Sequence, residues 1–159
     1  MARPLIALLL ACALALAACG DGGGSSQERV DVRIGDLTIH AEVANTSAER
    51  VPGLGGRDSL HRDAGMLFVH NDERQRTFWM RGMRFPLDFV WISAGRRVVD
   101  LTENVPPPAP GTADADLPTY HPDVPVQYVL EVNAGVVAEA GIAVGDAVAF
   151  EPEPPPAGE

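Results

Sequence analysis

Apolar and polar residues alternate along VDVRIGDLTIHAEVA (residues 30–44), and Gly35 and Asp36 interrupt the alternation at its centre. A period of two is typical of a half-buried strand, and a glycine-containing pair between two such runs predicts a β-hairpin. Further short apolar runs, separated by polar or glycine-bearing turns, predict more strands: MLFVH (66–70), RTFWM (76–80), FPLDFVWI (85–92), RRVVDLTE (96–103), VQYVLEVN (126–133) and VGDAVAFE (144–151). Strand signals therefore dominate the chain.

Two segments favour short helices instead. In TSAERVPGL (46–54), Thr46 or Ser47 can serve as the N-cap and Glu49 lies in the first turn, while the following Pro-Gly pair limits the helix to about two turns. In AGVVAEAG (134–141), the closing Gly141 suits the left-handed conformation in which helices commonly end. The sequence thus predicts two helices, neither of them long.

A proline-rich stretch, NVPPPAPGTADADLPTYHPDVP (104–125), separates the predicted strands near residues 100 and 130. Its prolines exclude a helix or a central strand, and a loop of this length in a compact domain is functional, runs over the surface or is locally disordered. With this loop set aside, the pattern predicts a mainly β fold of the β-rich α+β kind. We expect a compact small barrel or a strongly curled sheet with two short helices.

The start of the chain, MARPLIALLLACALALAAC, has one positive charge before an apolar run that is shorter than the roughly 20 residues of a membrane span. This is typical of a secretory signal, and its last four residues resemble the bacterial lipobox. We therefore predict a lipoprotein signal peptide over residues 1–18 and acylation of Cys19, which holds the protein to a membrane. The absence of aspartate after Cys19 favours the periplasmic side of the outer membrane.

The rest of the chain divides into a glycine- and serine-rich tether (19–29), a single domain (30–151) and a proline-rich acidic tail (152–159). A formal net charge of −10 argues against a nucleic-acid partner, since phosphate binding needs positive charge. No cysteine follows Cys19, so the domain has neither a disulfide nor a cysteine metal site. No cofactor motif is present, and the histidines lack metal-ligand spacing.

Four motifs resemble those of the DUF192 family, which comprises prokaryotic domains of unknown function: ERVPGLGGRDSL, DAGMLFVH, FWMRGMRFPLDFVWI and YVLEVNAGVVAEAGIAVGDAV. Their order and spacing match the family over residues 43–150, most specifically at FWM (78–80), PLD (86–88) and VLEV (129–132). The resemblance implies a compact β-rich fold and frequent export, but no reaction or ligand. This chain departs from the family pattern at Gly55 and at Gly82-Met83, and its 104–125 loop has no cysteine.

Two carboxylates interrupt apolar runs, Asp88 in FPLDFVWI and Glu131 in VQYVLEVN. Strand alternation places each side chain opposite its apolar neighbours, and Pro86 indicates that the first of these strands starts here or lies at an edge. Together the carboxylates would form an acid/base pair for hydrolysis. Alternatively, each accepts hydrogen bonds from backbone amides or from an arginine, the candidates being Arg50, Arg57, Arg81 and Arg84.

No known nucleophile, metal or nucleotide motif is found in the sequence, which favours a binding or accessory module for a small ligand, a glycan or an envelope protein. Trp79 alternates with Phe78 and Met80, and it either packs in the core, which is the more common role, or lines a groove that accepts a sugar ring or a peptide. The candidate ligand-binding residues are Arg50, Arg57, Trp79, Met80, Asp88, Tyr120 and Glu131. The competing hypothesis is a hydrolase that uses Asp88 and Glu131 and holds an anionic substrate with Arg50 or Arg57.

Overall fold

The structure, a computed structural model, describes residues 27–159. The predicted signal peptide, Cys19 and most of the tether lie outside these residues. Seven strands form one sheet and two form a small second sheet, and the strands are β1 (Arg29–Ile34), β2 (Leu37–Ala44), β3 (Ala64–Arg74), β4 (Phe78–Trp79), β5 (Leu87–Ile92), β6 (Val98–Val105), β7 (Thr119–Tyr120), β8 (Val126–Asn133) and β9 (Val148–Glu151). The predicted hairpin at Gly35 joins β1 to β2 in antiparallel register.

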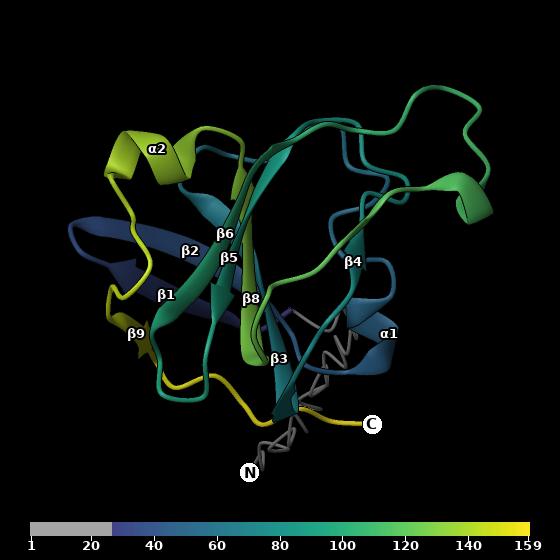
Figure 1. Ribbon diagram of the computed structural model, residues 1–159. Coiled ribbons are helices and arrows are strands. Elements are labelled where there is room, and N and C mark those ends of the chain that lie inside the picture. Colours follow the sequence, from purple (N-terminus) through teal and green to yellow (C-terminus); the bar gives the residue numbers. More distant parts are fainter. Residues whose placement is uncertain (1–26) are drawn as a thin grey trace, which may run out of the picture.

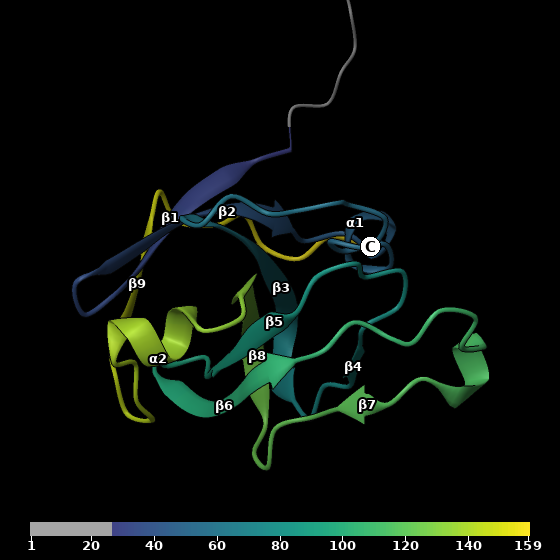
Figure 2. The same cartoon turned by 90° about the horizontal axis from the view of Figure 1, so that it is seen from above.

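The large sheet has the order β6-β5-β8-β3-β2-β1-β9, and only the β2–β3 pair is parallel. It curls until its two edge strands approach each other at one end (Figures 1 and 2). There Arg97 bridges to Ala147, and the Val98 and Val148 amides donate hydrogen bonds of 2.9 Å across the junction. The predicted small barrel or strongly curled sheet is confirmed.

Both predicted helices are present and short. Thr46 caps α1 (Ser47–Arg50) in a reciprocal capping box with Glu49, and α2 (Val136–Ala140) ends at Gly141, whose φ is 67°. α1 has a single turn instead of about two, because the chain continues after it as a series of turns. Within residues 27–159, neither helix is long and apolar enough to cross a membrane.

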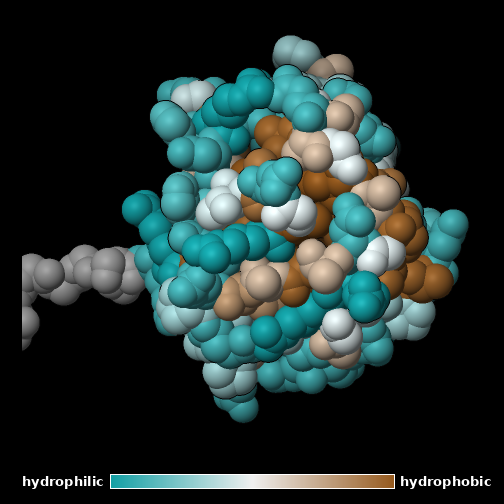
Figure 3. Space-filling view, turned by 90° about the vertical axis from the view of Figure 1, so that its left-hand side faces the viewer, coloured by the Kyte–Doolittle hydropathy of each residue, from teal (hydrophilic) through white to brown (hydrophobic). Residues whose placement is uncertain are grey.

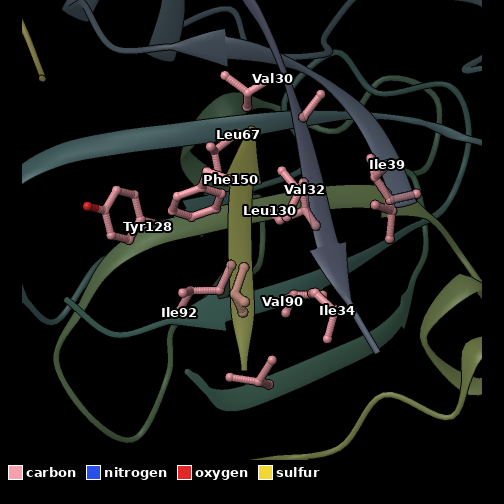
Figure 4. Packing of buried hydrophobic residues seen from close by; sticks show 14 of the residues in the cluster. Val30, Val32, Ile34, Ile39, Leu67, Val90, Ile92, Tyr128, Leu130 and Phe150 are labelled. Carbon is pink, nitrogen blue, oxygen red and sulfur yellow. The ribbon is translucent and has the colours of Figure 1, made fainter. Parts of the chain in front are cut away.

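Apolar side chains cover both faces of the central strands. On the inner face, side chains from β1, β2, β3, β5, β8 and β9 point into the barrel, among them Val32, Leu67 and Leu130 (Figure 4). On the outer face, Phe89 and Trp91 belong to a second buried cluster, over which the loops around residues 51–60 and 75–86 pack. A sheet buried on both faces explains why β5 is apolar at every position except Asp88.

Three segments differ in detail from the sequence expectations. β5 begins directly after Pro86, as predicted, but lies between β6 and β8 and is therefore not an edge strand. The proline-rich loop includes a 3₁₀ turn, η1 (Asp114–Asp116), and the unpredicted strand β7, which pairs with β4 (Figure 2). After β9 the chain returns to α1, where the Gly158 amide donates to the Asn45 carbonyl over 2.8 Å.

The face that carries α2 and β9 shows apolar side chains between polar ones (Figure 3). Val144, in the turn between these two elements, is 62 % exposed, and Val124, in the loop before β8, is also exposed. Both line one shallow surface pocket, together with Val98, Val99 and Pro125.

Candidate functional site

Glu131 lies in the middle of β8, opposite Phe89 of β5 and Met66 of β3. Its side chain points to the outer face of the sheet, among apolar neighbours, and the residue is only 5 % exposed. Burial raises the pKa of the Glu131 carboxyl to about 8, because the charged form loses its hydration in an apolar surrounding. At neutral pH the group is protonated and offers an O–H donor.

A pocket of about 140 Å³ opens above Glu131. One wall is formed by the end of α1 and the turns that follow it, and the other by β4 and the turn after it. The pocket is lined by Arg50, Val51, Pro52, Gly53, Leu54, Gly55, Phe68, Thr77, Phe78, Trp79, Arg81, Met83 and Glu131. Glu131 is thus a carboxylic acid that faces a concave space whose walls combine apolar side chains with arginines and backbone groups. Small-molecule sites likewise place a few polar groups among apolar side chains.

The two walls are held together by a close backbone approach. The Gly56 amide donates to the Gly82 carbonyl over 2.8 Å. At Gly55, a Cβ atom would lie 2.8 Å from the Arg81 carbonyl oxygen and 2.9 Å from that of Pro52, so a larger residue would force the turns apart. Glycine at this position therefore sets the width of the pocket.

Two arginines line the pocket from opposite walls. Arg50 donates to the Val69 carbonyl over 3.2 Å and also to the Asn45 carbonyl, which ties α1 to β3. Arg81 lies 2.8 Å from the Asp114 carboxylate and places its guanidinium 5.6 Å from the centroid of the Trp79 ring. Because arginine does not lose its proton in proteins, both residues bring a positive charge to the pocket walls.

Asp88 does not share this pocket. It lies opposite Val132, one residue away from Glu131 in the register, and therefore faces the inner side of the sheet. Its two carboxylate oxygens accept hydrogen bonds from the backbone amides of Asn104, over 2.7 Å, and Val137, over 3.1 Å. Asp88 thus anchors a bend of β6 and the start of α2, and the proposed pairing with Glu131 is wrong because the sheet separates the two carboxylates.

The other candidates divide between the pocket and the core. Arg50, Trp79 and Glu131 line the pocket, and Trp79 is 42 % exposed at its mouth. Arg57 binds Glu42 through two hydrogen bonds of 2.9 and 2.7 Å, which lower the pKa of the Glu42 carboxyl. Arg57 does not line the pocket, and neither do Met80 and Tyr120. Met80 is buried in the outer cluster, and Tyr120 packs against the Phe89 ring.

Sequence reasoning missed part of the pocket wall. Phe68, Phe78 and Leu54 read as ordinary core positions, and nothing in their local pattern distinguishes them from core. Met83 and Gly55 did carry a signal, because both stand where this chain departs from the family pattern. Among residues 27–159, no three His, Cys, Asp or Glu side chains gather where they could hold a metal ion.

The fold and the site define a class of protein, a curled β-barrel domain with a buried acid under a surface pocket. The family model DUF192, described as Uncharacterized ACR, matches residues 30–150, and the chain belongs to this family. No functionally curated protein matches the chain.

Two solved structures are similar to this chain. One, of a protein of unknown function from Novosphingobium aromaticivorans DSM 12444, is 35 % identical with a TM-score of 0.66, over 76 % of this chain and 83 % of that one. The other, described as a candidate transcription regulator, comes from Sinorhizobium meliloti 1021 and is 27 % identical with a TM-score of 0.70, over 81 % of this chain and 98 % of that one.

Proposed function

We propose that this protein is an envelope domain that binds a small ligand in the pocket above Glu131 and is held to the membrane by a lipid on Cys19. The observation that carries the binding role is the buried carboxyl group at the base of the pocket, whose pKa is raised by burial alone. A ligand that accepts a hydrogen bond from this carboxyl group would give its buried proton a protein-shielded partner.

The geometry disfavours the hydrolase alternative. General acid/base hydrolysis by two carboxylates requires both groups to face one substrate, whereas Asp88 and Glu131 point to opposite faces of the sheet. Asp88 is also engaged by two backbone amides. A single protonated acid beside aromatic walls suits recognition of a ligand better than cleavage of one.

The binding role can be tested by NMR with ¹³C-methyl methionine in the full-length protein, purified in detergent. Met83 lines the pocket, whereas Met66 and Met80 belong to the same buried cluster but do not line it. A ligand in the pocket is expected to shift the Met83 methyl signal saturably and to shift the other two less. If no compound of a diverse fragment library shifts Met83, the pocket is not a ligand site.

The membrane role rests on the sequence of residues 1–19, which resembles a lipoprotein signal that ends at Cys19. Mass spectrometry of the mature N-terminus is expected to find acylated Cys19, and Cys19→Ser is expected to move the protein from the membrane fraction to the soluble one. Fractionation of the envelope would then place the acylated form in the outer membrane, as we propose. An unmodified mature N-terminus beyond residue 19 would refute the anchor.

A further inference from the structure

The charges around the pocket do not match the charge of the whole protein. The chain is acidic, with a formal net charge of −10, yet the charged side chains that line the pocket are Arg50 and Arg81. Arg81 is balanced by Asp114, whereas Arg50 donates to two backbone carbonyls and a serine hydroxyl. Arg50 also lies beside the Glu49 carboxylate, but neither Glu49 nor Asp114 lines the pocket. The pocket walls therefore bring two arginine side chains and no acidic side chain besides Glu131 to a ligand, which favours an anion over a cation.

We propose that the ligand is a small monocarboxylate, which accepts a hydrogen bond from the Glu131 carboxyl group and is balanced in charge by Arg50 and Arg81. This inference rests on the proposed binding function and adds the ligand's chemical class. A carboxylic acid that donates to a carboxylate forms a short, charge-assisted hydrogen bond, among the strongest available to a protein. Burial of the pair away from water strengthens it further.

The size of the pocket limits the ligand. A cavity of about 150 Å³ accepts benzene in an engineered protein, and the present pocket measures about 140 Å³. The apolar part of the ligand is therefore a single ring or a short chain, which would pack against Phe78 and Trp79. A longer molecule would have to extend past Trp79 into solvent, since this ring lies at the mouth and is partly exposed.

The proposed contact depends on one proton. The elements packed against Glu131 present apolar side chains from β3 and β5, and the charged residues that line the pocket with it are Arg50 and Arg81, with Asp114 paired to the latter. Because the arginines do not titrate in this range, Glu131 alone controls the pH dependence. Its pKa is raised to about 8, so binding is expected to be constant up to neutral pH and to weaken about tenfold per pH unit well above 8.

The experiment uses benzoate as the probe, with benzyl alcohol as a neutral analogue of similar shape, and follows the Met83 methyl signal of the full-length protein. Benzoate is expected to bind at pH 6–7 and benzyl alcohol at least about tenfold more weakly, because hydrogen bonds to charged groups are the stronger ones. Glu131→Met, which introduces an apolar side chain of similar length, is expected to weaken benzoate binding by a similar factor. Glu131→Gln is expected to bind without pH dependence.

A matched pair of arginine variants distinguishes the effect on binding of a charge at the pocket from the effect of the protein's net charge. Arg81→Gln removes a guanidinium that lines the pocket, whereas Arg84→Gln removes one in the same turn that pairs with Asp58 and does not line it. Benzoate binding is expected to weaken several-fold in the first variant and to stay unchanged in the second. Equal losses in both would overturn the role of the pocket arginine.

The outcomes distinguish failure of this inference from failure of the binding function. If the Met83 signal shows that benzyl alcohol binds as tightly as benzoate, the pocket is a ligand site but does not select its ligand by charge. The inference is then overturned. If neither probe shifts Met83 but other fragments do, the monocarboxylate class is wrong and the binding function remains. If no fragment shifts it, both fail together.

Discussion

Replacing Glu131 with glutamine removes the titrating group from the base of the pocket while keeping the size of the side chain. In the wild-type protein, the pKa of this carboxyl is raised from 4.5 to about 8 by burial. Between these values the folded protein keeps a proton that the unfolded chain has released, so a rise in pH favours unfolding. The free energy of unfolding is therefore expected to fall with pH in the wild type, and this component is absent in Glu131→Gln.

The most informative window is pH 6.5 to 8. Below it, His70 acts in the opposite direction, because burial lowers its pKa to about 4 and the unfolded chain takes up a proton as the pH falls below about 6.5. Within the window the unfolded chain has lost the Glu131 proton and the folded protein still holds most of it. At about 1.4 kcal/mol per proton and pH unit, the wild type is expected to lose about 1.5 kcal/mol relative to the variant.

Urea unfolding of both proteins, followed by tryptophan fluorescence at several pH values in this window, measures the difference. Exposed groups titrate alike in the two proteins, so their contributions cancel when the two free energies of unfolding are subtracted. The amide of Glu131→Gln can change the free energy of unfolding of the variant by the same amount at every pH. Such a constant change does not affect the slope of the difference against pH. If the difference between the two proteins stays flat from pH 6.5 to 8, the carboxyl group is not buried as a neutral acid.

Three further substitutions test other parts of the structure. Asp88→Ala leaves two backbone amides without their acceptor and is expected to lower the free energy of unfolding in urea by about 3 kcal/mol; a change below about 1 kcal/mol would contradict this anchoring role. Thr46→Ala removes the capping box of α1 and is expected to cost about 1 kcal/mol in the same measurement. Trp79→Phe leaves Trp91, which is fully buried, as the sole tryptophan, so acrylamide quenching of tryptophan fluorescence should drop sharply; unchanged quenching would show that Trp79 is not exposed.

The strands of the barrel could be predicted because one physical rule governs them. Alternation along residues 30–44 gives the β1–β2 hairpin, and the apolar runs give the central strands β5 and β8. The order of the strands has no such local signal, since it depends on pairing between segments far apart in the chain. β7 was missed for another reason: it is two residues long, lies in a proline-rich segment and depends on its pairing with β4.

The same sequence signal led to two different outcomes at Asp88 and Glu131. Each is a carboxylate inside an apolar run, and alternation correctly places each opposite its neighbours. Alternation does not reveal the register between two strands, and here Asp88 lies opposite Val132 instead of Glu131. A shift of one residue places the two carboxylates on opposite faces. One therefore holds backbone in place and the other opens onto the pocket, a difference that the sequence alone does not contain.

The junction between the two edge strands of the barrel has a consequence for how the protein folds. β9 pairs with β1, with Asp31 opposite Glu151, while Arg97 and Ala147 bridge the other edge of the sheet. One edge of β1 is paired locally with β2, but its other edge finds its partner only when the last strand is available. Contacts between such distant segments form slowly, and the exposed edge of β1 is open to wrong partners until then. We expect closure of the barrel to be a late event, completed only after nearly the whole domain has been synthesised.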